Sequence, residues 1–116
     1  MLIRTDPTSD QPLFAQVAGS IRADAASGRL MPGDRLPAAR DVAAALGINL
    51  HTVLRAYQEL RDEGLVDMRR GRGAVVTDAA APLAELHGDI RALAERARAL
   101  GLSTDSLASI IKEMTP

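Results

Sequence analysis

Three glycines divide residues 12–64 into helix-sized segments, and this spacing restricts the fold more than the composition does. Gly28, Gly47 and Gly64 each follow a segment in which apolar residues recur every three or four positions. A glycine directly after such a segment is typical of a helix end, because glycine adopts the left-handed backbone conformation at no steric cost. The pattern predicts three helices, over about residues 12–27, 39–46 and 50–63.

A short link, Gly47-Ile48-Asn49, joins the second and third predicted helices, as in a helix-turn-helix. Residues 65–68 then alternate apolar and polar side chains, residues 69–73 form a basic glycine-rich turn, and residues 74–77 form a returning strand. Helices followed by such a hairpin predict a winged helix-turn-helix over residues 1–78. The fold class is mainly α with a small β-hairpin, and the polar residues 1–11 are expected to form a flexible arm.

Many fixed spacings resemble the DNA-binding domain of GntR-family transcription regulators. The matching segments are Pro12-Leu13-Phe14, Gly28-Arg29-Leu30, Pro32-Gly33-Asp34-Arg35-Leu36-Pro37, Arg40-Asp41-Val42-Ala43, Leu46-Gly47, Thr52-Val53, Ala56-Tyr57, Leu60, Glu63-Gly64-Leu65-Val66 and Gly71-Arg72-Gly73. Asn49, Thr52-Val53 and the run from Arg55 to Leu60 are similar to the YtrA-type branch in particular. Leu50 and His51 depart from the Pro and Asn common in that branch, and Ala38 from the common Ser; these departures bear on base preference.

The resemblance implies a sequence-specific regulator that binds double-stranded DNA. The helix over 50–63 would place its N-terminal residues in the major groove, where Asn suits adenine and Thr suits a phosphate or a thymine methyl group. The resemblance places Arg40 against DNA, and the glycines beside Arg72 permit close approach to a phosphate or the minor groove. The candidate DNA-binding residues are Arg40, Asn49, Leu50, His51, Thr52, Arg55, Arg70, Gly71, Arg72 and Gly73.

Each candidate also has a purely structural interpretation. Asn49 can cap the third helix, which is compatible with base contact. Thr52 and His51 can be ordinary surface residues, and Arg55 can pair with Glu59 four positions on. The basic hairpin tip can be a solvated turn.

The net charge of −1 requires any basic surface to be local. Residues 1–78 contain ten Arg and ten Asp or Glu, whereas residues 79–116 contain four basic and five acidic residues. Three arginines gather at residues 69–72. We therefore expect modest DNA affinity for one copy and a dimer for useful binding.

Residues 79–116 form the second predicted region, a two-helix dimerisation segment that opens at Pro82 and breaks at Gly101. Its apolar positions follow spacings of three and four, and Ser103 or Thr104 is placed to cap the second helix. Such helices bury their apolar sides either on the first helix of the same chain or on a second copy. A two-fold homodimer suits a palindromic operator, the resemblance implies the same, and analogy favours a repressor. The candidate dimerisation residues are Leu83, Leu86, Ile90, Leu93, Ala97, Leu100, Leu107, Ile110, Ile111 and Met114.

Several other functions are disfavoured. Without cysteine and with only two histidines, the chain offers no metal site, and no cofactor is expected. No paired carboxylates, Ser-His-Asp set or phosphate-binding loop indicates an enzyme. No apolar run spans a bilayer and no signal peptide is evident, so we expect a soluble, cytoplasmic protein. The alternative is a winged-helix protein-interaction adaptor, which would not need Arg40, Arg55 and Arg72 together; a small-molecule effector is left open.

Overall fold

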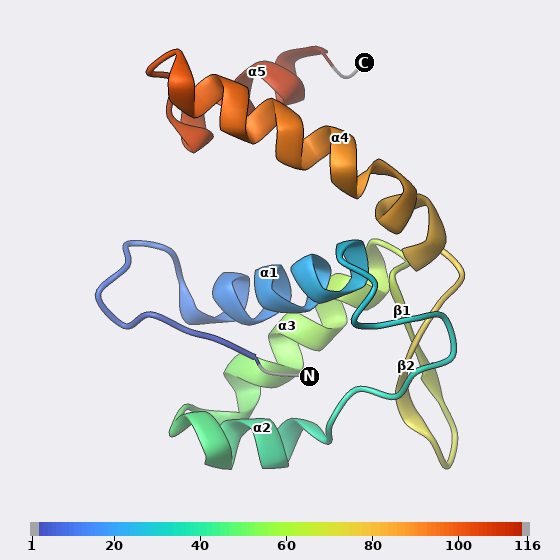
Figure 1. The fold of residues 1–116 in the computed structure, drawn as a ribbon. Coiled ribbons are helices and arrows are strands. Elements are labelled where there is room, and N and C mark those ends of the chain that lie inside the picture. Colours follow the sequence, from blue (N-terminus) through green and yellow to red (C-terminus); the bar gives the residue numbers. More distant parts are fainter. Residues whose placement is uncertain (1–2, 115–116) are drawn as a thin grey trace. The chain divides into compact units, whose positions relative to one another are not determined.

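The computed structural model describes residues 3–114 and confirms the mainly α fold with one β-hairpin. Its elements are α1 (Leu13–Ala26), α2 (Ala39–Leu46), α3 (Leu50–Asp62), β1 (Val66–Arg69), β2 (Gly73–Val76), α4 (Ala80–Ala99) and α5 (Thr104–Met114) (Figure 1). Tertiary contacts divide the chain into two units. Unit 1 ends at Glu85 and unit 2 begins at Leu86, so α4 starts in one and continues into the other.

Unit 1 is built around an aliphatic core to which α1 and α3 contribute most. Val17 and Ile21 of α1 are fully buried, as are Val53 and Leu60 of α3. These positions recur every three or four residues, so each helix directs one side into the core. The hairpin adds Val66 and Val76 to the same core, and α2 adds Val42 and Ala43.

The expected flexible arm is instead attached to α1 over its described residues. Ile3 is buried in the core of unit 1, and the Arg4 amide donates to Ser20 Oγ at 3.1 Å. Further along, the Asp6 amide donates to Gln16 Oε1, and Gln16 Nε2 donates back to the Asp6 carbonyl. The prediction of a flexible arm was wrong because the side-chain oxygens of α1 satisfy backbone donors of this extended segment.

The sheet has an additional edge that the sequence did not indicate. β1 and β2 pair antiparallel, with Val66 opposite Val76 and Arg69 opposite Gly73, one residue away from the predicted strand bounds. On the other side of β2, residues 33–36 bond to it: the Gly33 amide donates to Val76 O at 2.8 Å and the Leu36 amide to Ala74 O at 2.9 Å. The loop between α1 and α2 thus holds the hairpin in place.

The helix of the second region begins at Ala80 rather than at Pro82. Proline is compatible with this position because the first turn of a helix leaves its amides without intrahelical partners. In unit 2, the Leu102 amide donates to Ala97 O at 2.8 Å and closes the end of α4. Ser103 Oγ then accepts from the Ser106 amide at 3.1 Å, which makes Ser103 the cap of α5. No helix within residues 3–114 is long and apolar enough to cross a membrane.

Candidate nucleic-acid interface

The N-terminus of α3 is fixed by Asn49, whose Oδ1 accepts a hydrogen bond from the His51 amide at 2.8 Å. This geometry is that of a helix cap, because it satisfies one of the amides that the first turn leaves unpaired. The capping interpretation of Asn49 is therefore confirmed. The bond engages the amide oxygen only, so the two N–H donors of the side chain are not used by it.

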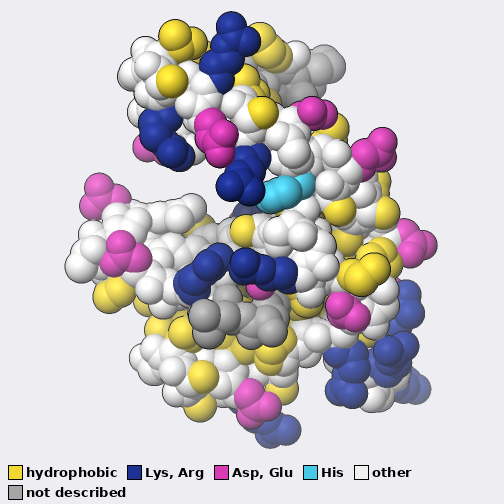
Figure 2. All heavy atoms as spheres, viewed as in Figure 1, with side chains coloured by type: hydrophobic (Ala, Val, Ile, Leu, Met, Phe, Trp, Pro, Cys, Tyr) yellow, Lys and Arg dark blue, Asp and Glu magenta, His cyan; other side chains and the backbone are white. Residues whose placement is uncertain are grey.

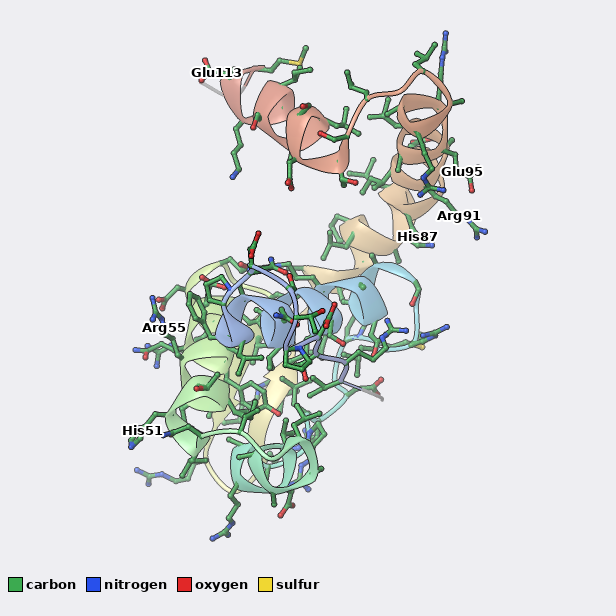
Figure 3. All side chains as sticks on the ribbon, turned by 90° about the vertical axis from the view of Figure 1, so that its left-hand side faces the viewer. His51, Arg55, His87, Arg91, Glu95 and Glu113 are labelled. Carbon is green, nitrogen blue, oxygen red and sulfur yellow. The ribbon has the colours of Figure 1, made fainter. Side chains whose placement is uncertain are left out.

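α3 presents a buried side and an exposed side. Leu50 and His51 are exposed at its N-terminal end, and Thr52 is half-buried. Figure 3 shows His51 and Arg55, one turn apart, projecting outward from the same side of the helix. Arg40 is exposed as well, near the start of α2.

Arg55 is held by α1 rather than by its own helix. Its guanidinium carbon lies 3.7 Å from the centroid of the Phe14 ring, a cation–π contact. The structure does not show the alternative pairing of Arg55 with Glu59. Instead, Glu59 Oε2 accepts a hydrogen bond from Arg22 Nη2 at 3.3 Å. Arg22 also pairs with Glu63 at 2.7 Å, and this hydrogen bond is the main reason why the pKa of Arg22 is raised. Two side chains of α1, Phe14 and Arg22, thus hold the side of α3 that carries Arg55 and Glu59.

The hairpin tip carries the basic groups that the net charge conceals. Figure 2 shows Lys and Arg side chains gathered over the hairpin, at the lower right. Arg69, Arg70 and Arg72 are all exposed. The turn requires glycine at residues 71 and 73, where φ is +79° and +73°. A residue with a side chain would be strained in this left-handed conformation, whereas glycine is not.

Sequence reasoning missed Arg35, which belongs to this basic tip. Its Nε donates to the Arg72 carbonyl at 2.9 Å, and Arg72 Nη2 approaches the Gly33 carbonyl at 3.5 Å. Arg35 is distant from the hairpin in sequence, so only the pairing of residues 33–36 with β2 places it there. We define Arg35, Arg69, Arg70 and Arg72 as the basic tip.

The candidate dimerisation residues divide into two sets. Leu83 packs against the core of unit 1, and Ala97 is buried within unit 2, so both are used inside the chain. Leu107 is half-buried beside Ala97 and Leu102, with which it lines one hollow. The others are exposed, namely Leu86, Ile90, Leu93, Leu100, Ile110, Ile111 and Met114. His87, Arg91 and Glu95 line a different, polar side of α4, where Arg91 pairs with Glu95 at 3.3 Å (Figure 3).

Comparison with known protein families shows which family has this arrangement of helices and hairpin. Residues 13–76 match the family model of bacterial regulatory proteins of the gntR family, and this match spans α1 to the end of β2. The chain belongs to the GntR family. Relatives include the HTH-type transcriptional repressor YtrA of Bacillus subtilis, 35% identical over 66% of this chain and 59% of that protein. The regulator Rv1152 of Mycobacterium tuberculosis is 35% identical over 87% of this chain and 84% of its own length.

Solved structures share the fold. YtrA from Sulfolobus acidocaldarius matches with a TM-score of 0.64 and 35% identity, covering 85% of this chain and 99% of that one. The N-terminal domain of AraR, solved in complex with mutant ORR3, matches with a TM-score of 0.55 and 27% identity over 58% of this chain and 96% of that one. This GntR-family chain is therefore a transcription regulator with a DNA-binding domain, and not an enzyme.

Proposed function

We propose that the protein is a homodimeric repressor in which unit 1 binds one half of a palindromic DNA operator. The observation that supports this most directly is the arrangement of α3. Its inner side is sealed in the core, while its N-terminal end exposes Leu50 and His51 beside the Asn49 cap. A helix anchored in this way enters the major groove as a rigid element.

The basic tip supplies the contact with the DNA backbone in this proposal. Arg70 and Arg72 neutralise phosphates, and Gly71 and Gly73 let the backbone of the turn approach the duplex closely. Arg35 supports the turn from the side of residues 33–36 and adds a further charge. Arg40 and Thr52 add polar contacts beside the recognition end of α3, whereas Arg55 contacts phosphate while stacked on Phe14.

Unit 2 provides the dimer contact in this proposal. Leu86 and Ile90 are each 52% exposed, and with Leu93 they follow a spacing of four and three along α4. Leu100, Ile110, Ile111 and Met114 add further exposed apolar surface. Apolar side chains exposed at this density mark an association surface, and a second copy with the same surface satisfies it by two-fold symmetry.

Repression follows from occupancy of the operator. A dimer bound at a promoter blocks polymerase sterically and needs no activating contact. B. subtilis YtrA, a relative over 66% of this chain, is named a repressor. Two copies related by two-fold symmetry imply two inverted half-sites.

Selection of bound duplexes from a random DNA library tests this function. We expect an inverted repeat, protection of both half-sites, and two copies of the chain per duplex. Affinity should fall steeply with salt, and Arg72→Ala should reduce the slope of log affinity against log salt by about one. Asp10→Ala, in the exposed segment before α1, is the matched surface control and should leave the slope unchanged. Enrichment of no sequence, or of a single half-site with one copy bound, would contradict the proposal.

A further inference from the structure

Two leucines of α3 lie on its exposed side and are not needed for the core. Leu50 is 41% exposed and Leu54 is 43% exposed, although both are large and apolar. They are four residues apart, so they are neighbours on one side of the helix. The core side of α3 is already formed by Val53, Ala56, Tyr57 and Leu60. We call Leu50 and Leu54 the leucine pair.

In the first turns of α3, the rest of the exposed side is divided between His51 and Arg55; Gln58, Arg61 and Asp62 are exposed further along the helix. In a helix of 3.6 residues per turn, His51 lies between the leucine pair on one flank and Arg55 with Glu59 on the other. That second flank is engaged, because Arg55 stacks on Phe14 and Glu59 pairs with Arg22. Near the capped N-terminus of α3, the leucine pair and His51 therefore remain available to DNA, and the leucine pair is the apolar part of this surface.

We propose, resting on the DNA-binding function above, that the leucine pair selects thymine by contact with its C5-methyl group. That methyl is the apolar group that the four bases present in the major groove; their other edge groups there are hydrogen-bond donors and acceptors. A leucine against those polar groups removes them from water and returns no hydrogen bond. The pair therefore favours thymine and disfavours guanine and cytosine at the positions that it faces.

The geometry of the helix limits where these thymines lie. Four residues of helix rise by about 6 Å, and adjacent base pairs are separated by about 3.4 Å. The leucine pair therefore contacts methyl groups one or two base-pair steps apart in each half-site.

The small size of the patch favours this occupant over a protein partner. In the described part of unit 1, the exposed large apolar side chains are Met31, Leu50, Leu54 and Met68, and the leucine pair is the only adjacent set within one helix. A stable protein interface buries about 800 Å² on each partner, far more than two half-exposed leucines supply. A methyl group in a groove needs no larger surface.

Removal of single methyl groups from the selected operator tests the proposal. Each thymine is replaced in turn by deoxyuridine, which lacks only the C5-methyl group, and affinity is measured by fluorescence anisotropy. We expect a three- to fourfold loss at one or two positions per half-site. Leu54→Ala should abolish the loss at one position and Leu50→Ala at the other. Met31→Ala, an exposed apolar residue of the α1–α2 loop, should keep the full sensitivity.

A second substitution separates the methyl group from the base pair. Cytosine at a sensitive position should weaken binding, and 5-methylcytosine should recover part of the loss. Both Leu→Ala variants should stay folded, because the leucine pair is outside the core and alanine favours helix; thermal melting checks this. If the protein binds a specific sequence but deoxyuridine has no effect, the inference is overturned and the proposed function is not. The same holds if both Leu→Ala variants lose as much affinity on deoxyuridine substitution as the unsubstituted protein does. Absence of specific DNA binding overturns the proposed function as well.

Discussion

The two units differ in how they use their apolar side chains. In unit 1, α1, α2, α3, the start of α4, both strands and the segment before α1 contribute residues to one buried cluster. In the described part of unit 2, Ala97 is the buried hydrophobic residue, and leucines and isoleucines of both helices are exposed. Unit 1 therefore completes its core within one chain, whereas unit 2 leaves most of its large apolar side chains exposed, and these form the surface that we propose for association.

The ion pairs of Arg22 in unit 1 differ in the same way from the ion pair of α4. Arg22 joins α1 to α3 through Glu59 and Glu63, so it connects two elements of unit 1. The pair Arg91–Glu95 in unit 2 lies within α4 and supports only that helix. In unit 1, the ion pairs of Arg22 thus connect α1 with α3 and help to hold α3 in one orientation.

The largest effect that tests this contrast is expected from a charge on the apolar side of α4. Ile90→Asp should dissociate the proposed dimer, because a carboxylate in an apolar interface loses its hydration without a partner. Loss of bivalent binding should lower operator affinity on the order of 1,000-fold. Sedimentation and fluorescence anisotropy measure the two effects.

Ala92→Asp is the matched control, since residue 92 is exposed on another side of the same helix. It should remain dimeric and bind the operator normally. A dimeric Ile90→Asp variant would place the association surface elsewhere and break the comparison between the units.

The next effect is on folding and should distinguish a buried leucine from an exposed one. Leu60→Ala should lower the free energy of unfolding of unit 1 by about 3 kcal/mol, because it leaves a cavity in a fully buried site. Leu93→Ala should change this quantity by less than about 1 kcal/mol and weaken self-association instead. The chain has one tyrosine, Tyr57 in α3, so its fluorescence in denaturant reports on unit 1. Equal losses in both variants would contradict the separation.

Elements with a local signal were predictable. The bounds of α2 and the order of all elements follow from apolar periodicity and from glycines that end helices, and these signals lie within a few residues of each element. The cap at Asn49 was also anticipated, because capping depends on the two residues that follow. Leu54 was missed as a candidate, although its spacing from Leu50 and its place outside the buried stripe were visible in the sequence.

Features that depend on distant segments were not predictable. The burial of Ile3, the addition of residues 33–36 to the sheet, and the stacking of Arg55 on Phe14 each join parts of the chain that no local pattern relates. The same reason explains why Arg35 was absent from the predicted basic surface. For unit 2 the sequence indicates amphipathic helices, but not which side chains the chain uses internally.

High pH should weaken unit 1 selectively through Tyr57. Burial raises the pKa of this phenol to about 12, and its hydroxyl donates to the Pro37 carbonyl at 2.7 Å. An unfolded tyrosine ionises near pH 10, so the folded state holds the proton more tightly. The stabilisation is complete below about pH 10 and is lost as the pH rises towards 12, by about 2 kcal/mol.

Tyrosinate absorbance and denaturation at several pH values measure this loss. Tyr57→Phe should remove the tyrosine-linked fall in stability between about pH 10 and 12, because phenylalanine does not titrate. An unaltered pH dependence in this variant would show that another group controls the alkaline unfolding of unit 1.

The smallest effect compares the helix caps of the two units. Asn49 caps α3 and Ser103 caps α5, each by accepting an amide hydrogen bond at its helix N-terminus. Asn49→Ala should lower the free energy of unfolding of unit 1 by about 1 kcal/mol. Ser103→Ala should destabilise α5 by a similar free energy, seen as a loss of helicity in unit 2. Only the first should alter base preference, since only α3 is proposed to contact bases. Asn49→Ser separates the two roles, because serine restores the cap but lacks the amide that pairs bidentately with adenine. If Asn49→Ser recovers both stability and base preference, Asn49 acts through the cap alone, and base selection belongs to its neighbours on α3.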